Sequence, residues 1–386
     1  MTRLARIAAL LLMSTALLIS CAKQEDVIKI GEYGSLTGTT ATFGISTKNG
    51  IDMAVEKVNQ AGGLLGKKVV VIVEDDQGKP EEAATAVKKL INQDKVIAIL
   101  GEVASSRSKA GAPICQAAKI PMVSPASTNP DVTSIGDYIF RVCFIDPFQG
   151  TVMAKFCWNT LKVKTAAILT DVKNDYSVGL AEYFKKTFQQ LGGKVVAEES
   201  YSEGDIDFKA QLTAIKAKRP ETIFIPGYYT EVGLIARQAR ELGIKLPLTG
   251  GDGWDSPKLM EIGGEALENC YFSNHYHPQD PNPVIQNFVK EYQAKYNEVP
   301  DAMAVLGYDV AMVLTDAIKR AGTTEPEAIR DQLAVTKDFE GVSGKITIDA
   351  NRNASKSAVV VKIEGGKLKY VETVFPDQPL EAASTE

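Results

Sequence analysis

Short apolar runs alternate with amphipathic segments along most of the chain. The runs are rich in Val and Ile and are bounded by Gly or Pro, and the segments between them place apolar residues at helical spacing. The strands expected in the first half are VIKIGEYG at 27–34, KKVVVIVED at 67–75, VIAIL at 96–100 and PMVSP at 121–125, with helices over 43–61, 80–93 and 105–118. This alternation predicts parallel strands joined by crossover helices.

The same alternation begins again at Thr165. The strands expected there are TAAILTD at 165–171, KVVAEESY at 194–201, TIFIPG at 222–227 and LPLTG at 246–250, with helices over 179–191, 208–218 and 232–242. Gly101 and Pro121 of the first unit recur at Gly227 and Pro247 of the second, in each case 126 residues later. The repeat predicts two similar lobes whose strands point their carboxyl ends into a shared cleft, where ligands bind in such sheets.

The remaining segment, 271–376, is too short and too mixed for a third domain. It carries a Pro-rich loop, helices over 283–296 and 302–321, and strands at 344–349 and 357–363. We expect it to cross back and complete both lobes, which would give the several connections that a hinge needs. The predicted fold class is α/β, with two Rossmann-like doubly wound lobes joined by a multi-strand hinge. The expected parts are an N-terminal lobe of 27–145 and 276–352, a C-terminal lobe of 146–275 and 353–376, and a polar tail of 377–386.

The first twenty residues are typical of a secretory signal peptide. Arg3 and Arg6 precede an apolar run that is too short to span a bilayer. The stretch LISC at 18–21 resembles the bacterial lipoprotein signal, in which the chain is cut before a cysteine that carries lipid, here Cys21. The alternative is an ordinary secretion signal with an incidental cysteine. We expect a mature chain that starts with a lipidated leader, 21–26, and is attached to the membrane only through Cys21.

Charge and motifs exclude several classes of function. Removing Arg3 and Arg6 from the 43 basic residues leaves 41 against 48 acidic ones, a net charge of −7 for the mature chain. Nucleic acid is therefore not an expected partner. The chain lacks a GxSxG elbow, a Walker phosphate loop and a GxGxxG turn after a strand, so we expect neither an enzyme nor a cofactor.

Histidines and cysteines are few. His275 and His277, the only histidines, lie in the Pro-rich loop as HYH. They could chelate a metal, but two solvated loop residues are the simpler interpretation, and we expect no metal. The four cysteines after Cys21 have no metal-like spacing and could form two disulfides in three possible pairings or remain buried thiols. These are Cys115, Cys143, Cys157 and Cys270.

Three polar segments directly follow expected strands. They are GEVASSRS at 101–108, SPASTNP at 124–130 and TGGDGWDS at 249–256. Each is, by itself, a common helix cap or turn. The first two lie on one lobe and the third on the facing lobe, so together they predict the two walls of a binding site.

The residue types in these segments suit a zwitterion. The Ser105 and Thr128 hydroxyls, with the backbone N–H groups of the Ser and Thr residues there, would bind a carboxylate at a helix N-terminus. Asp252 and the Ala126 carbonyl would bind an ammonium group. Charge-assisted hydrogen bonds of this kind are stronger than neutral ones, which favours a charged ligand at both ends.

At these segments the sequence resembles the branched-chain amino-acid (leucine/isoleucine/valine) binding proteins of ABC importers, of the periplasmic binding protein type I family. The likeness covers nearly the whole mature chain and includes GEVASS, SPAST, DYSVGLA, GYYTEVGLIARQARELG and GGDGWDS. The resemblance implies that Ser105 and Thr128 hold the α-carboxylate, and that Asp252, at a position that is Glu in some relatives, holds the ammonium group. The other ligand-binding residues that we predict are Phe43, Val103, Ala104, Ala126, Ser127, Tyr176 and Tyr228. Phe43 stands where some relatives have Tyr.

The function implied is that of an extracytoplasmic solute-binding lipoprotein. It would capture an amino acid, preferably Leu, Ile or Val, and deliver it to the permease subunits of an ABC importer. We expect a monomer at the periplasm or cell surface. The alternatives are the same fold binding short amides, urea or another small polar ligand, a sensory receptor, and a secreted hydrolase.

Overall fold

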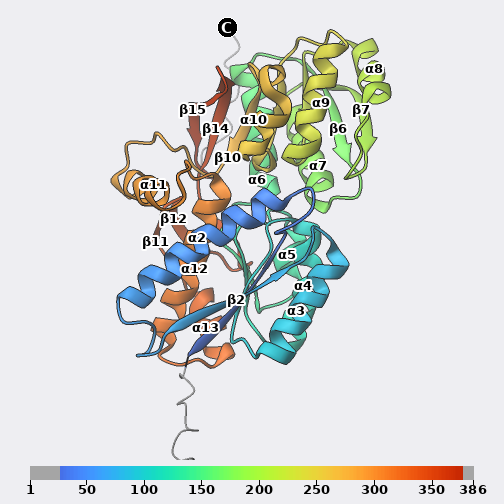
Figure 1. Ribbon diagram of the computed structural model, residues 1–386. Helices are drawn as coiled ribbons and strands as arrows, with labels where there is room; N and C mark the ends of the chain where they lie inside the picture. Colours follow the sequence, from blue (N-terminus) through green and yellow to red (C-terminus); the bar gives the residue numbers. More distant parts are fainter. Residues whose placement is uncertain (1–26, 377–386) are drawn as a thin grey trace, which may run out of the picture.

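The computed structural model describes residues 27–376, which form two lobes that lie one above the other in Figure 1. The lower lobe contains a five-stranded sheet of order β2-β1-β3-β4-β5, and all four strand pairs are parallel. Its strands are β1 (Ile28–Gly34), β2 (Val69–Asp75), β3 (Ile99–Leu100), β4 (Met122–Ser124) and β5 (Ile139–Arg141). The predicted signal peptide, the Cys21 anchor and the tail lie outside the described residues.

The upper lobe contains a seven-stranded sheet of order β15-β14-β10-β9-β8-β6-β7. Its parallel part consists of β6 (Thr165–Asp171), β7 (Lys194–Tyr201), β8 (Thr222–Ile225), β9 (Leu248–Gly250) and β10 (Tyr271–Asn274). The antiparallel hairpin of β14 (Ala358–Glu364) and β15 (Lys367–Val374) extends this sheet along β10. The order β7-β6-β8-β9-β10 repeats β2-β1-β3-β4-β5, so the prediction of two similar doubly wound lobes is confirmed.

Helices cover both sheets (Figure 1). Those of the lower lobe are α2 (Ala41–Gln60), α3 (Pro80–Lys89), α4 (Ser105–Ala118), α5 (Asp131–Ser134), α11 (Pro283–Tyr296), α12 (Ala302–Ala321) and α13 (Pro326–Ala334). Those of the upper lobe are α6 (Asp146–Lys155), α7 (Asp175–Gln190), α8 (Lys209–Lys218), α9 (Tyr229–Glu241) and α10 (Pro257–Gly263). Short turns of other helix types are η1 (Leu90–Asp94), η2 (Phe156–Thr160), η3 (Asp252–Trp254) and η4 (Gly264–Leu267).

Two glycines allow α2 and α12 to cross closely. A Cβ at Gly50 would lie 2.0 Å from the Ala304 carbonyl oxygen, and a Cβ at Gly307 would lie 2.2 Å from the Thr47 carbonyl oxygen. Any side chain at either position would therefore push the helices apart. This crossing fixes α12, most of whose residues are buried, against α2 of the same lobe.

The chain passes between the two sheets three times. It leaves the five-stranded sheet between β5 and α6, returns after β10, and leaves again before β14. The last passage follows a small three-stranded sheet of β11 (Phe339–Gly341), β12 (Gly344–Ile348) and β13 (Ala354–Ser355). We keep the lobe boundaries given above as a proposal, and we propose a hinge at these three passages, the last of which lies between β13 and β14.

Most predicted elements are present within a few residues of their expected bounds, but several short ones escaped prediction. Helix α7 begins at Asp175, four residues before its predicted start, because the Asn174 side chain accepts a hydrogen bond from the Tyr176 N–H group at 3.1 Å. Helix α6 has buried residues around most of its circumference and so lacks a one-sided apolar pattern. Strand β5 has only three residues, too few for a periodic signal.

The cysteine question is settled for the described residues. Cys115, Cys143, Cys157 and Cys270 are all free and buried, so the buried-thiol alternative is correct. Burial raises the pKa of each thiol, to about 12 for Cys143 and Cys157. Between residues 27 and 376, no helix is both long enough and apolar enough to cross a membrane.

Candidate ligand-binding site

The two lobes are in contact along α2 of the lower lobe and α9 of the upper lobe. The Phe43 ring packs edge-on against Tyr228 and Tyr229, with centroids 5.6 and 4.8 Å apart. Beside it, the Thr42 N–H group donates to the Tyr229 hydroxyl at 3.2 Å, and the Thr42 and Ser256 hydroxyls lie 2.9 Å apart. Phe43 is therefore fully buried between the lobes, and the structure describes a closed arrangement.

A second zone of contact joins α4 to α7. The Asn129 side chain donates to the Asp175 carbonyl at 2.8 Å, and the Asp175 N–H group donates to the Ser106 hydroxyl at 2.9 Å. Arg107 forms an ion pair with Glu203 of the upper lobe at 3.7 Å and with Glu102 of its own lobe at 3.1 Å. These contacts hold the first two strand-end segments, 101–108 and 124–130, against the upper lobe.

All the predicted ligand-binding residues are buried, and the six that are apolar or aromatic belong to one hydrophobic cluster that spans both lobes. That cluster includes Phe43, Val103, Ala104, Ala126, Tyr176 and Tyr228. Tyr176 and Tyr228 stack in parallel, with centroids 5.3 Å apart. The Tyr176 hydroxyl accepts a hydrogen bond from the Gly253 N–H group at 3.1 Å, which ties the aromatic pair to the Asp252 loop.

On the lower wall, the three hydroxyls differ in what they contact. The Ser127 hydroxyl lies 3.0 Å from the carbonyls of Glu102 and Val103 and 2.7 Å from the Ser108 hydroxyl, so it is fully engaged within its lobe. The Ser105 hydroxyl accepts a hydrogen bond from the Asn129 N–H group at 3.1 Å and retains its own hydrogen to donate. The Thr128 hydroxyl is buried and interacts with the Asp146 carboxylate, but it forms no hydrogen bond of good geometry with any residue described.

Arg141 holds this wall from behind, a role that we did not predict. Its buried guanidinium donates to the carbonyls of Ser127 and Asn129, the latter at 2.8 Å, and to the Thr133 hydroxyl at 3.2 Å. Burial lowers the pKa of Arg141. Because the carbonyls of Ser127 and Asn129 accept hydrogen bonds from Arg141, the loop between β4 and α5 is held in place against the upper lobe.

On the upper wall, Asp252 is anchored by two neighbours. Its N–H group donates to Gln149 Oε1 at 2.7 Å, and its Oδ2 atom is 2.9 Å from His275 Nε2. Its Oδ1 atom is buried and meets no hydrogen-bonding group in the described part of the chain. The expectation of solvated loop histidines is wrong, because His275 and His277 are both buried. Within 27–376, no group of three or more His, Cys, Asp or Glu is placed to hold a metal.

A second carboxylate, Asp146, lies beside Asp252 and was missed by the sequence analysis. It begins α6, is completely buried, and has no described hydrogen-bond partner for either oxygen. Burial raises its pKa well above the ordinary value, and the charge of Asp252 raises it further, against the opposing effects of Thr128 and Arg141. An Asp before Pro at a helix start is a common turn signal, and for that reason the sequence did not single it out.

Comparison with known proteins places this geometry in a family. The model of the family described as periplasmic binding protein matches residues 27–367. The chain belongs to the periplasmic binding protein family. Membership of this family of binding proteins implies a location outside the cytoplasm.

Several relatives of this periplasmic binding protein are named for the amino acids that they bind. A leucine-, isoleucine-, valine-, threonine- and alanine-binding protein of Pseudomonas aeruginosa is 32% identical over 87% of this chain and 90% of its own length. The solved leucine-binding protein LivK of Thermotoga maritima is 45% identical, with a TM-score of 0.88 over 91% of this chain and 99% of that one. The solved LivJ of Streptococcus pneumoniae, in complex with isoleucine, is 35% identical, with a TM-score of 0.86 over 91% of this chain and all of that one (100%).

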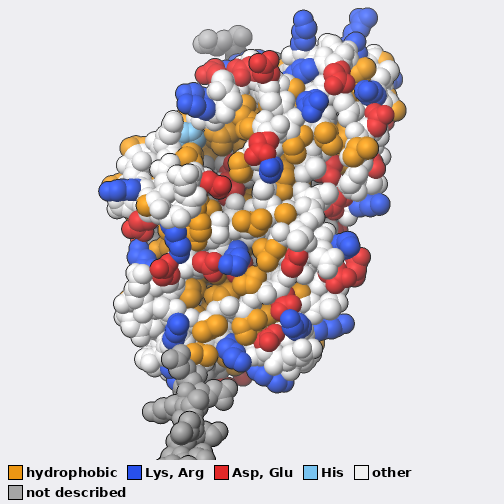
Figure 2. All heavy atoms as spheres, in the orientation of Figure 1, with side chains coloured by type: hydrophobic (Ala, Val, Ile, Leu, Met, Phe, Trp, Pro, Cys, Tyr) orange, Lys and Arg blue, Asp and Glu red, His pale blue; other side chains and the backbone are white. Residues whose placement is uncertain are grey.

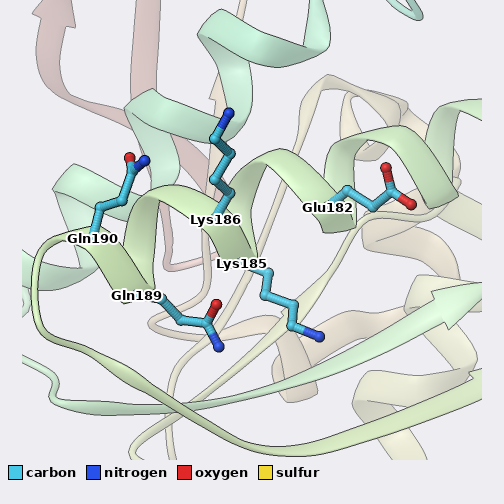
Figure 3. Close-up of a pocket in the computed structure, with 5 residues that line it drawn as sticks. All are labelled: Glu182, Lys185, Lys186, Gln189 and Gln190. Carbon is cyan, nitrogen blue, oxygen red and sulfur yellow. The ribbon is translucent and has the colours of Figure 1, made fainter.

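Two hollows of this periplasmic binding protein differ in character. One of about 340 Å³ lies at the junction of the lobes and is lined by residues of both, among them Ala104, Arg107, Asn174 and Tyr228. The other, of about 480 Å³, lies on the outer surface of α7 (Figure 3). Its lining side chains come from this one helix and point in different directions, so they do not converge on a ligand.

Charged groups of both signs are interspersed over the face in Figure 2, without a basic patch for nucleic acid.

Proposed function

We propose that this protein binds a branched-chain amino acid, Leu, Ile or Val, as a zwitterion between its closed lobes and delivers it to the permease of an ABC importer. The names of the relatives support this ligand class. The observation that carries the proposal is a set of buried oxygen atoms that lack described partners at the lobe junction. They are Thr128 Oγ1, both carboxylate oxygens of Asp146, and Asp252 Oδ1.

The physical argument concerns desolvation. A buried carboxylate without a hydrogen-bond donor is strongly unfavourable, and its partner is usually a cation or a proton. An ammonium group has three donors, enough for Asp252 Oδ1, an oxygen of Asp146 and a neutral oxygen such as the Ala126 carbonyl. A ligand with such a group would therefore stabilise the closed state more than the open one, because only closure surrounds it.

The opposite end of the ligand would meet the lower wall. The Ser105 hydroxyl, the Thr128 hydroxyl and the first-turn N–H groups of α4 are donors for an α-carboxylate, since the first turn of a helix has no acceptors of its own for these groups. Phe43, Tyr176 and Tyr228 would surround the aliphatic side chain, together with Val103 and Ala104. Ser127 would act through the loop that it stabilises.

We further propose the setting in which this binding occurs. Lipid attachment at Cys21 would hold a monomeric receptor at the periplasm or cell surface, and the closed lobes would be the form that the permease recognises. No catalytic step is proposed. Radiolabelling with a fatty acid, compared between the native precursor and Cys21→Ser, would test the anchor.

Calorimetry on ligand-stripped protein tests the ligand class. Leu, Ile and Val should bind, while 4-methylpentanoate, which lacks the amino group, and 3-methylbutylamine, which lacks the carboxylate, should bind at least a hundredfold more weakly. Tight binding of urea or short amides in place of amino acids would establish the alternative. Failure of every amino acid to bind would refute the proposal.

A further inference from the structure

We infer that His275 is a positioning residue for the ligand's ammonium group, acting through Asp252. It contacts one oxygen of the Asp252 carboxylate and leaves the other for the ligand. The inference rests on the proposed function, since it concerns the site that would bind the amino group.

Two contacts fix the His275 imidazole, and a third fixes its backbone. His275 Nε2 is 2.9 Å from Asp252 Oδ2, and the ring stacks on Phe144 with a centroid distance of 3.9 Å and an interplanar angle of 18°. The His275 backbone N–H group donates to Asn274 Oδ1 at 2.8 Å, and the Asn274 side chain donates to Asp255 at 2.9 Å. The histidine side chain is fully buried. An imidazole held in this way can control the direction of a carboxylate.

The proton arrangement follows from the partners. A carboxylate can only accept from the imidazole, so Nε2 carries the hydrogen and Nδ1 is the bare nitrogen of a neutral ring. Burial lowers the pKa of His275, although Asp252 acts in the opposite direction. Other titratable groups that interact with His275 or Asp252 are Lys356, Cys143, Asp146, Tyr176 and Asp255.

The neighbouring carboxylate explains why such positioning is needed. Burial and the charge of Asp252 raise the pKa of Asp146, whereas the Thr128 hydroxyl and the charge of Arg141 lower it. By holding Asp252 Oδ2, His275 leaves Oδ1 as the oxygen that can face the ammonium group beside Asp146. His275 also links the ligand to the hinge, because it and Phe144 lie on two of the three passages between the sheets.

Two variants separate positioning from packing. His275→Phe keeps a ring to stack on Phe144 but has no donor, and His275→Gln keeps an N–H donor. Calorimetry should show leucine binding weakened about tenfold or more in His275→Phe and largely recovered in His275→Gln. In the Asp252→Asn background, His275→Phe should add little further loss, because the two residues act as one unit. Equal losses in both backgrounds, or an unchanged affinity in His275→Phe, would overturn the inference.

Nuclear magnetic resonance of the wild-type protein gives an independent measurement if a variant fails to fold. Because the chain has only two histidines, the ¹⁵N signals of His275 can be assigned with a single His277→Gln variant. A neutral ring protonated at Nε2, perturbed on addition of leucine, is the expected result. Protonation at Nδ1 instead would refute the hydrogen bond on which the inference depends. If wild-type protein binds leucine and the variants behave otherwise, the inference fails alone; if wild-type protein binds no amino acid, the proposed function fails first.

Discussion

The two walls of the site differ in how far the protein itself supplies hydrogen-bond partners for their polar groups. On the lower wall the polar groups are largely satisfied by the fold itself: Ser127 and Arg141 bind the loop backbone, and Ser105 caps an adjacent N–H group. On the upper wall Asp146 and Asp252 retain buried oxygens without described partners. The lower wall is thus preorganised, while we propose that the ammonium group of the ligand completes the upper wall. A ligand that supplies the cation would stabilise closure where the protein alone does not.

The strongest test of this contrast is Asp252→Asn. It removes the negative charge and places an amide group where the ammonium would bind, so leucine affinity should fall at least a hundredfold. Isothermal titration calorimetry measures the loss. Asp331→Asn, at an exposed position of α13, is the matched control and should leave affinity unchanged. Retention of affinity in Asp252→Asn would show that the ammonium group binds elsewhere.

A second test compares the Ser127 and Thr128 hydroxyls of the lower wall. Thr128→Val should weaken leucine binding about fivefold to tenfold with little change in stability, because its hydroxyl forms no well-aligned hydrogen bond within the described protein. Ser127→Ala should instead lower the free energy of unfolding by about 1–2 kcal/mol, because its hydroxyl bonds within the lobe. Urea unfolding and calorimetry on both variants distinguish them. The reverse pattern would mean that the roles of the two hydroxyls are exchanged.

A third test uses Glu32, a buried carboxylate of β1 that belongs to neither wall. Glu32 is buried, its Oε2 atom has no described partner, and burial raises its pKa from 4.5 to about 8. The folded state therefore binds more protons than the unfolded state between these values, so this group lowers stability as pH rises, by up to about 1.4 kcal/mol per pH unit. Glu32→Gln should reduce the decline in unfolding free energy between pH 5 and pH 8 without altering leucine binding. An unchanged decline would contradict the assignment.

The smallest effect is expected at the edge of the lobe junction. Glu203→Gln weakens the 3.7 Å ion pair with Arg107, but Glu203 is partly exposed to solvent. Such pairs contribute at most about 1 kcal/mol, so leucine should bind about twofold to fivefold more weakly, with faster dissociation. Stopped-flow displacement measures the rate. A larger loss of affinity than that of Thr128→Val would show that closure depends more on the Arg107–Glu203 ion pair than on the ligand.

Local patterns sufficed to predict the lobes and one part of each wall. Parallel strands with crossover helices have short-range signals, and the carboxyl ends of such strands are brought together by the topology, so Ser105 and Asp252 could be placed on facing walls. Asp146, Arg141 and His275 could not be assigned, because their roles arise from tertiary contacts that no local pattern records. His275, for example, stacks on Phe144, which belongs to a different passage between the sheets. A histidine in a Pro-rich loop looks solvated until the fold covers it.

The four buried thiols have a practical consequence for following the motions of this molecule. Cys115 lies in the lower lobe, Cys157 and Cys270 in the upper lobe, and Cys143 next to the passage into α6, and none is paired. Each thiol would react with an alkylating reagent only when the part of the lobe that covers it opens locally. Site-resolved labelling rates would therefore show, without any engineered cysteine, which part of the protein a bound ligand makes rigid.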